Sequence, residues 1–221
     1  MCINFAATRN ADWVVGQFGT GLPDAGPVEV YPGFNGPLVV KSRRSGRIAC
    51  GSARFGLIPA WAKDEKPGRN TYNARSETAA DKASFRDPWR QAQYGLMLVD
   101  HFYEPDYETG RSIRWKIGLP CESPFGIASL WERWTSPATG EIVVSFTMLT
   151  VNADRHPLMK RFHKPADEKR TPVIIKPELH QAWLEATPDQ AMALMHWTHM
   201  PDLVASPCPG PRRPSTPQLG L

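Results

Sequence analysis

Residues 94–104 read YGLMLVDHFYE, and this stretch decides the class of fold. Its first part is apolar and rich in strand-favouring residues, whereas polar groups gather toward its end, at Glu104. This composition predicts a buried strand over residues 94–103. A carboxylate that ends a buried strand can have a raised pKa and serve as a general acid or base. A surface glutamate before the turn at Pro105 is an equally available interpretation of Glu104.

Six further segments share the β-branched and aromatic composition of strands. They are residues 38–41, 47–57, 113–118, 125–134, 142–151 and 173–175. Three helices are expected, after Ser76, after Pro177 and after Thr187, where Pro188 and Gln190 complete a capping pattern. Strands and helices do not alternate strictly, so we expect an α+β fold, a mostly antiparallel, barrel-like β-sheet with a few peripheral helices.

The bulk composition is that of a globular protein. The 221 residues are 41% hydrophobic and 22% charged, which excludes disorder throughout. We expect one domain over residues 1–205 and a disordered, proline-rich tail over residues 206–221, whose Arg212 and Arg213 supply two of the four net positive charges. No apolar run approaches the length of a membrane span and no secretory signal is present, so we expect a cytoplasmic protein that does not bind membranes.

The four cysteines lie far apart, at Cys2, Cys50, Cys121 and Cys208. Without a CxxC pair, a zinc ribbon or a redox dithiol is not expected, and nothing else in the sequence predicts a metal or a cofactor. Cys2 is unusual because loss of Met1 alone would make it the N-terminal residue. Its amine and thiol, with ordinary pKa values of about 8 and about 8.5, would then form a 1,2-aminothiol that condenses with an aldehyde to a thiazolidine. A small buried residue at the start of a strand is the alternative interpretation.

Several segments carry residues suited to nucleic acid. Asn73 and Arg75 could face a phosphodiester, although Asn73 could equally cap a helix. Trp61 is either a surface on which a base stacks or a lid over the core. The acid-free run at residues 41–47 contains Lys41, Arg43 and Arg44 and is either a phosphate contact or a solvated hairpin loop.

Taken in order, these segments resemble a known family. The resemblance rests on Cys2, GLIPAWAKD (56–64), NARSET (73–78), Phe85 with Arg86, FYE (102–104), ASLWE (128–132), FTMLTVNA (146–153), PLMKRFH (157–163) and RTPVII (170–175). The family is that of the SOS-response-associated peptidases, or SRAP proteins, which shield abasic sites in single-stranded DNA. The resemblance runs from Cys2 to about residue 175.

The resemblance implies a role for four residues. Cys2, exposed by autocatalytic removal of Met1, would bond to the aldehyde of an abasic deoxyribose as a thiazolidine. Asn73 would orient the N-terminal residue, Glu104 would shuttle protons near the sugar, and His163 would assist Schiff-base formation. Glu168, two residues before Arg170, competes with His163 for the histidine role, and His156 is a third candidate.

The resemblance also implies a DNA surface. Arg75, Arg86 and Arg170 would hold phosphates, and Trp61 would lie at the DNA-binding face. The expected partner is single-stranded DNA that contains abasic sites, bound by a monomer that associates with the nucleoid when on DNA and that could meet replication-fork proteins. An imine intermediate would also permit an AP-lyase side activity. Asn4 stands where arginine is usual, and Pro105 follows the FYE element in place of tryptophan.

Two other functions remain open at this point. The first is an N-terminal-cysteine amidohydrolase or peptidase that uses the Cys2 thiol on non-DNA substrates. The second is a nucleic-acid-binding module in which the basic run and Trp61 carry the affinity and Cys2 is inert. Formation of a covalent adduct with abasic DNA distinguishes the first interpretation from both alternatives.

Overall fold

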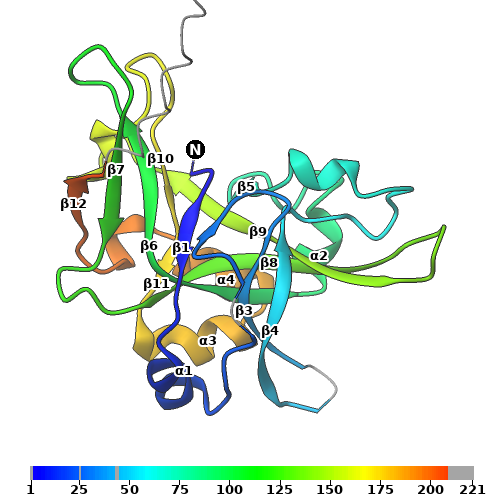
Figure 1. Cartoon of the computed structure of the whole chain (residues 1–221). Coiled ribbons are helices and arrows are strands. Elements are labelled where there is room, and N and C mark those ends of the chain that lie inside the picture. The colour runs from blue at the N-terminus through cyan, green and yellow to red at the C-terminus, as the bar shows by residue number, and fades with distance from the viewer. Residues whose placement is uncertain (1, 25, 43–44, 209–221) are drawn as a thin grey trace, which may run out of the picture.

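Five strands close into a barrel at the centre of the molecule (Figure 1). The structure is a computed structural model and describes residues 2–24, 26–42 and 45–208. Neighbouring strands follow the order β8, β9, β4, β3 and β6, and the pairing of β6 with β8 closes the ring. These strands are β3 (Asn35–Lys41), β4 (Ile48–Phe55), β6 (Tyr94–Asp106), β8 (Phe125–Thr135) and β9 (Ile142–Asn152). All pairings around the ring are antiparallel except that of β4 with β9, so the expected barrel-like α+β fold is confirmed.

Shorter strands extend this barrel. They are β1 (Phe5–Ala7), β2 (Glu29–Val30), β5 (Asn73–Arg75), β7 (Ile113–Gly118), β10 (Arg170–Pro172), β11 (Ile174–Ile175) and β12 (Val204–Pro207). Each of the seven predicted strands is present. β12 pairs with β7, so the boundary expected after Ala205 falls inside a strand, while residues 209–221 of the predicted tail lie outside the described residues.

The helices are short and peripheral. They are α1 (Ala11–Phe18), α2 (Arg86–Arg90), α3 (His180–Glu185) and α4 (Pro188–Leu194), with single 3-10 turns at Lys66–Arg69, Met159–Arg161, Pro177–Leu179 and Trp197–His199. The capping box at Thr187 is present, and the helix expected after Pro177 begins as a 3-10 turn that leads into α3. None of the helices in the described ranges is both long and apolar enough to cross a membrane.

The prediction of a helix directly after Ser76 is wrong. Residues 76–85 form a series of turns, and α2 begins only at Arg86. The backbone N–H of Ser76 donates to the carbonyl oxygen of Thr150 on β9 (3.0 Å). This bond continues the parallel pairing of β5 with β9. Ser76, which the sequence pattern predicts as a helix cap, therefore extends the sheet instead.

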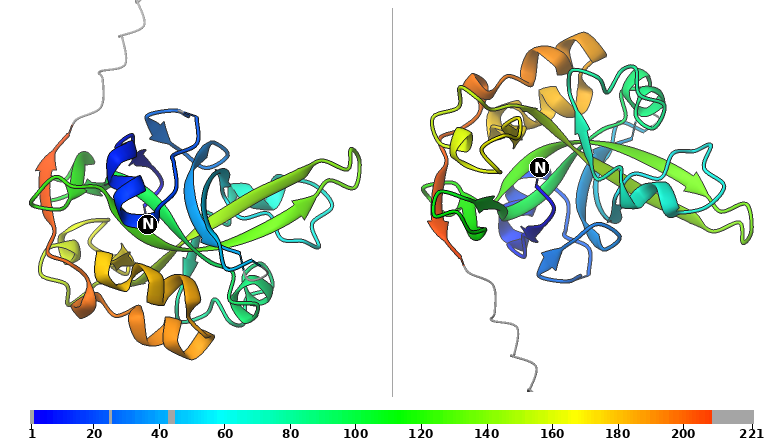
Figure 2. Two further views of the ribbon diagram at one scale, coloured as in Figure 1. Left: turned by 90° about the horizontal axis from the view of Figure 1, so that it is seen from below. Right: turned by 90° about the horizontal axis from the view of Figure 1, so that it is seen from above.

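The core is centred on β6, which pairs with β1, β3, β7 and β8 and is therefore buried on both faces over most of its length. Aromatic rings fill the interior, and Phe55 lies 5.4 Å from both Phe5 and Phe146. Helices α1 and α3 meet at one end of the barrel, where the ring of Phe18 stacks on His180. The N-terminal end of β1 and strand β5 lie at the opposite end (Figure 1), and the hairpin of β8 and β9 extends outward from the barrel (Figure 2).

Candidate functional site

Strand β1 brings Cys2 alongside the last residues of β6. Phe5 pairs with Phe102 in antiparallel register, and the N–H of Tyr103 donates to the carbonyl oxygen of Asn4 (3.3 Å). Since the two strands run in opposite directions, Cys2 comes close to Glu104. Cys2 is 1% exposed. Burial, and next the charge that Glu104 carries once it ionises, raise the pKa of the Cys2 thiol well above its ordinary value, so the thiol is protonated at neutral pH.

Strand β5 supplies the residue that holds Cys2. Asn73 opens β5, which pairs in parallel with β9 at Met148. Its side-chain Nδ2 donates a hydrogen bond to the carbonyl oxygen of Cys2 (2.7 Å). The Oδ1 atom of Asn73 is buried and has no hydrogen-bond partner among the described residues. The amide therefore fixes the main chain of Cys2 and retains an acceptor for a further donor.

Glu104 is a buried carboxyl group to which the described residues offer none of the hydrogen bonds that a buried acid normally has. It is 1% exposed, and within the described ranges neither carboxyl oxygen has a hydrogen-bond partner. Burial raises the pKa of Glu104 to about 8 because the charged form loses its hydration. Glu104 is therefore largely protonated at neutral pH and can donate a proton.

His163 reaches the same place from the other side. It follows the 3-10 turn at Met159–Arg161, has a φ of +69°, and its N–H donates to the carbonyl oxygen of Pro105 (2.9 Å). The ring Nε2 lies 3.5 Å from Oε2 of Glu104 and 3.4 Å from the carbonyl oxygen of Arg170. Burial lowers the pKa of His163 to about 4, so its ring is neutral at pH 7. The structure thus brings together Cys2, Asn73, Glu104 and His163.

The two alternatives to His163 have other contacts. The carboxylate of Glu168 accepts hydrogen bonds from Arg75 (2.6 Å) and Arg170 (2.8 Å). His156 accepts hydrogen bonds from the backbone N–H groups of Leu158 and Met159 through Nδ1, and its ring lies 5.5 Å from that of Trp197. Of these three candidates, His163 is the one whose side chain lies beside Glu104.

Three of the predicted DNA contacts are exposed. Arg75 and Arg86 are each about half-exposed, and Arg86 forms a weak ion pair with Asp87 (3.6 Å). Trp61 is 57% exposed and donates from Nε1 to the carbonyl oxygen of Ala83 (3.2 Å). All three side chains reach the surface, and Arg75 is held there by its ion pair with Glu168 (2.6 Å).

Arg170 is placed differently. It is 2% exposed and forms a bidentate ion pair with Glu77 (2.9 and 2.8 Å), a second pair with Glu168, and a hydrogen bond to the carbonyl oxygen of Thr150 (2.7 Å). A guanidinium group with these partners joins the turn after β5 to strands β9 and β10. A phosphate contact at Arg170 stays a prediction, but it would require the loss of an existing ion pair.

The basic run at residues 41–47 lies away from Cys2. Lys41 ends β3 and forms an ion pair with Glu185 of α3, the helix at the opposite end of the barrel from the N-terminal end of β1 (Figure 1). Arg43 and Arg44 lie outside the described residues. The structure therefore does not bring the described part of this run to the four clustered residues.

Sequence reasoning missed a polar network beside Cys2. The carboxylate of Glu29 on β2 accepts hydrogen bonds from Asn4 (3.3 Å), Tyr31 (3.0 Å), Tyr103 (3.2 Å) and Arg114 (2.7 Å). The guanidinium carbon of Arg114 lies 3.3 Å from the centre of the Tyr103 ring. The network ties β1, β2, β6 and β7 together. No local sequence motif predicts this network, because its members come together only in the tertiary fold.

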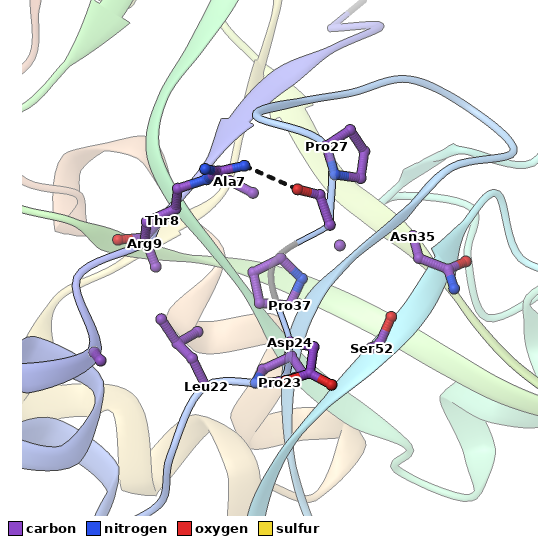
Figure 3. A pocket seen from close by; sticks show the side chains of 13 residues that line it. Ala7, Thr8, Arg9, Leu22, Pro23, Asp24, Pro27, Asn35, Pro37 and Ser52 are labelled. Carbon is purple, nitrogen blue, oxygen red and sulfur yellow. Dashed lines mark hydrogen bonds between the residues drawn. The ribbon is translucent and has the colours of Figure 1, made fainter.

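A separate hollow lies between β1, β3 and β4. It has a volume of about 350 Å³ and is lined in part by Leu22, Pro23 and Pro37, while Arg9 donates to the carbonyl oxygen of Gly26 (3.0 Å) across it (Figure 3). The residues predicted for the site are absent from its lining. Among the described residues, no group of three or more His, Cys, Asp or Glu side chains could hold a metal ion.

Comparison with known proteins adds to this geometry. Residues 1–208 match the family model described as SOS response associated peptidase (SRAP). The chain is 31% identical over 207 residues to the abasic site processing protein YoqW of Bacillus subtilis, covering 88% of this chain and 86% of that protein. It is 26% identical over 160 residues to the abasic site processing protein HMCES of Pongo abelii, covering 55% of this chain and 44% of that protein.

Solved structures match across almost the whole chain. A crystal structure of a protein from Bordetella bronchiseptica has a TM-score of 0.84 and 30% identity, with 94% of this chain and 99% of that chain covered. A protein from Bacteroides thetaiotaomicron has a TM-score of 0.77 at 21% identity, with 93% of this chain and 91% of that chain covered, and shows the same fold.

Proposed function

Because this chain belongs to the SOS response associated peptidase (SRAP) family, we propose that it processes abasic sites in DNA and links itself to them through Cys2. The names of its relatives support the first part of this proposal. The contact between Asn73 and the Cys2 carbonyl supports the second, because it fixes the residue that would react beside a proton donor and a neutral imidazole.

The proposed reaction needs a free N-terminal amine. Removal of Met1 by hydrolysis of the peptide bond that joins it to Cys2 would supply this amine, in keeping with the peptidase name of the family. An abasic deoxyribose in its ring-opened form presents an aldehyde. The amine adds to the aldehyde carbon, the resulting carbinolamine loses one water, and an imine forms. The thiol of Cys2 then adds to the imine carbon while its proton passes to the nitrogen, which closes a five-membered thiazolidine.

The residues around Cys2 suit these proton movements. Glu104 is protonated at neutral pH and can give its proton to the departing hydroxyl group as water leaves. His163 is neutral and can accept the proton that the attacking amine releases. Cys2 keeps its thiol proton until the ring closes, because its pKa is raised. Tethering of thiol to imine makes that closure fast relative to attack by a free thiol.

DNA would reach Cys2 along the exposed residues near β5. Arg75 and Arg86 offer guanidinium groups for phosphates, and Trp61 offers a ring for a base. The imine intermediate also permits β-elimination of the 3′ phosphate, which would appear as AP-lyase activity. The substrate is therefore proposed to be single-stranded DNA with an abasic site.

Mass spectrometry tests the proposal directly. The full-length chain is incubated with a single-stranded oligonucleotide that contains one abasic site, and the intact adduct is weighed. The expected mass is that of the chain without Met1, plus the oligonucleotide, minus one water. Cys2→Ala removes the thiol, and an oligonucleotide with a tetrahydrofuran in place of the abasic sugar removes the aldehyde, so neither should give this adduct.

Two results would contradict the proposal. A heat-stable adduct that persists with Cys2→Ala would exclude the thiazolidine, and a wild-type chain that lacks Met1 but forms no adduct would exclude the crosslink. If that chain instead became acylated by a peptide or an ester, an N-terminal-cysteine amidohydrolase would be the better description.

A further inference from the structure

Three exposed apolar side chains lie on the segment that carries Cys2 and on the turn that follows β2, the strand paired with β1. Ile3 is 50% exposed, Tyr31 is 40% exposed and Phe34 is 53% exposed. Single exposed apolar residues are common on protein surfaces, whereas a group of them beside a reactive residue indicates a binding surface. Burial of these side chains in the core would stabilise the fold, so folding does not explain why all three are exposed.

Contacts with the Glu29 carboxylate tie Tyr31 to the N-terminal segment that carries Cys2. The hydroxyl of Tyr31 donates to Oε2 of Glu29 (3.0 Å), and Nδ2 of Asn4 donates to the same oxygen (3.3 Å). The rings of Tyr31 and Phe34 lie 6.4 Å apart, edge to face. The two rings therefore form one aromatic surface next to the N-terminal segment, and we refer to this pair as the aromatic platform.

The turn that carries Phe34 is held firmly. Gly33 has a φ of +92°, which a residue with a side chain rarely adopts. The N–H of Phe34 donates to the carbonyl oxygen of Tyr31 (2.9 Å), and two more bonds join Gly33 and Phe34 to Phe55 (2.7 and 2.8 Å). The turn lies at the end of the molecule where β1 begins (Figure 1). A surface fixed in this way loses little conformational entropy when it binds a ligand.

Basic residues flank the platform. A hollow of about 310 Å³ lies beside Gly33 and is lined by Arg54, Lys66 and Arg69. Glu65 and Asp64 also line it and form ion pairs with Arg54 and Lys66, whereas Arg69 has no ion pair among the described residues. An aromatic surface beside cationic groups is the arrangement that binds single-stranded nucleic acid, with bases on the rings and phosphates on the cations.

We infer that the aromatic platform of Tyr31 and Phe34 stacks against the unpaired base next to the abasic nucleotide. This inference rests on the proposed function. The base beside an abasic site has lost its stacking neighbour, so one of its faces is free for an aromatic ring. Stacking on the platform would hold the neighbouring nucleotide and so place the abasic sugar at Cys2. Such stacking does not depend on the DNA sequence, because each of the four bases has a π-face.

A double-mutant cycle between protein and DNA tests the inference. The wild-type chain and Phe34→Ala are titrated with single-stranded oligonucleotides that contain an unreactive tetrahydrofuran site, and binding is followed by fluorescence anisotropy. In two further oligonucleotides the base on the 5′ side or on the 3′ side is also absent. For one of these sides, loss of the base should weaken wild-type binding about tenfold, and it should leave binding by Phe34→Ala almost unchanged.

Matched variants separate stacking from other effects. Phe34→Tyr keeps a ring and should retain the coupling, whereas Phe34→Leu keeps an apolar side chain and should lose most of it. Val15→Ala removes a side chain of equal exposure, 53%, from α1 at the other end of the barrel and should change nothing. Thermal unfolding of each variant shows that the fold is retained.

The inference is overturned if base removal weakens wild-type and Phe34→Ala binding equally on both sides. It is also overturned if Phe34→Ala changes the sedimentation coefficient without any coupling, because the surface would then join two copies of the chain. If the coupling is present but reactive abasic DNA gives no adduct with Cys2, the platform stands and the proposed crosslink fails.

Discussion

The side-chain amide of Asn73 donates a hydrogen bond to the carbonyl oxygen of Cys2 over 2.7 Å, although the two residues are 71 positions apart in the chain. Asn73 lies on a three-residue strand that is itself paired with β9 of the barrel. Cys2 is thereby attached to the central barrel. Precise placement of a nucleophile lowers the entropy cost of its reaction.

Asn73→Ala tests the value of this contact. Loss of one hydrogen bond should destabilise the fold by about 1 kcal/mol. The single-turnover rate of adduct formation with abasic DNA should fall about tenfold or more, because Cys2 would sample unproductive positions. Asn10→Ala is the matched control, since it removes the hydrogen bond that Asn10 Oδ1 accepts from the N–H of Trp13 at the start of α1. Equal rates for Asn73→Ala and Asn10→Ala would contradict a positioning role for Asn73.

Glu104→Gln should change how stability depends on pH. Burial raises the pKa of Glu104 to about 8, above its ordinary value of 4.5, so the folded state binds the proton more tightly than the unfolded state. The contribution of Glu104 to the stability of the fold is then greatest below pH 4.5 and falls as the pH rises toward 8. His163 acts in the opposite direction between pH 4 and 6.5, because its pKa is lowered to about 4.

Between pH 6.5 and 8 the Glu104 carboxyl group still titrates in the folded state, whereas the contribution of His163 is largely complete. Urea unfolding of the wild-type chain should show a decrease in stability across this window, and Glu104→Gln should show a flatter profile. A wild-type slope that survives the substitution would indicate that another group titrates. The same variant should form or reverse the adduct more slowly while it stays folded, because the amide that replaces the carboxyl group cannot transfer a proton.

Glu168→Gln should strengthen the binding of single-stranded DNA. The Glu168 carboxylate holds Arg75 at 2.6 Å, in the way that a phosphate oxygen would. With the charge removed, Arg75 becomes free for DNA, and both the affinity and its dependence on salt concentration should increase, the latter by about one counterion. Fluorescence anisotropy at several salt concentrations measures both quantities.

Glu185→Gln is the control for this experiment. It frees Lys41 on the opposite end of the barrel, where we expect no contact with DNA. If it strengthened binding as much as Glu168→Gln, the run at residues 41–47 would belong to the DNA surface after all. No gain from Glu168→Gln would place Arg75 outside that surface.

Arg75 and Arg170 should respond oppositely to substitution. Arg170→Met leaves Glu77 without its bidentate partner and Glu168 without one of its partners, and since Arg170 is buried while both carboxylates are partly exposed, the loss of these charged hydrogen bonds should cost about 2 kcal/mol of stability. Arg75→Ala should change stability by less than about 1 kcal/mol, since the group is half-exposed, but should weaken DNA binding. Unfolding curves and anisotropy titrations on both variants separate the two roles. Similar stability losses in both would contradict this assignment.

The strands were predictable because their composition is local information. Residues 94–99 are apolar whichever partners they meet, and β6 covers this range. The prediction of a helix after Ser76 was wrong because of a tertiary contact. The N–H of Ser76 donates a hydrogen bond to the carbonyl oxygen of Thr150 on β9. Short strands such as β5, with three residues, have no period that a pattern could reveal.

The grouping of the four candidate residues was predictable only through the resemblance to a family. Cys2, Asn73, Glu104 and His163 lie on four separate segments, and no spacing rule relates them. The resemblance also named Arg170, but sequence carried no sign that Glu77 would hold it in the interior. Phe34 escaped notice although it lies in the turn-rich stretch YPGFNGP (31–37), where an aromatic residue among glycines and prolines indicates a ring held at the surface.

Gly56→Ala should be among the most damaging substitutions in the chain. Gly56 follows β4 with a φ of +109°, and a Cβ there would overlap the carbonyl group of Gly68. That group is backbone, which cannot move aside as a flexible side chain could, so we expect a loss of about 3 kcal/mol or more. Gly51→Ala is the control, because a Cβ at Gly51 on β4 meets nothing within 4 Å. Urea unfolding should show a large shift for Gly56→Ala and a small one for Gly51→Ala. Equal shifts would mean that the loop between β4 and the turn at Lys66–Arg69 can relax, and that the position of Trp61 within it is not fixed by this close backbone contact.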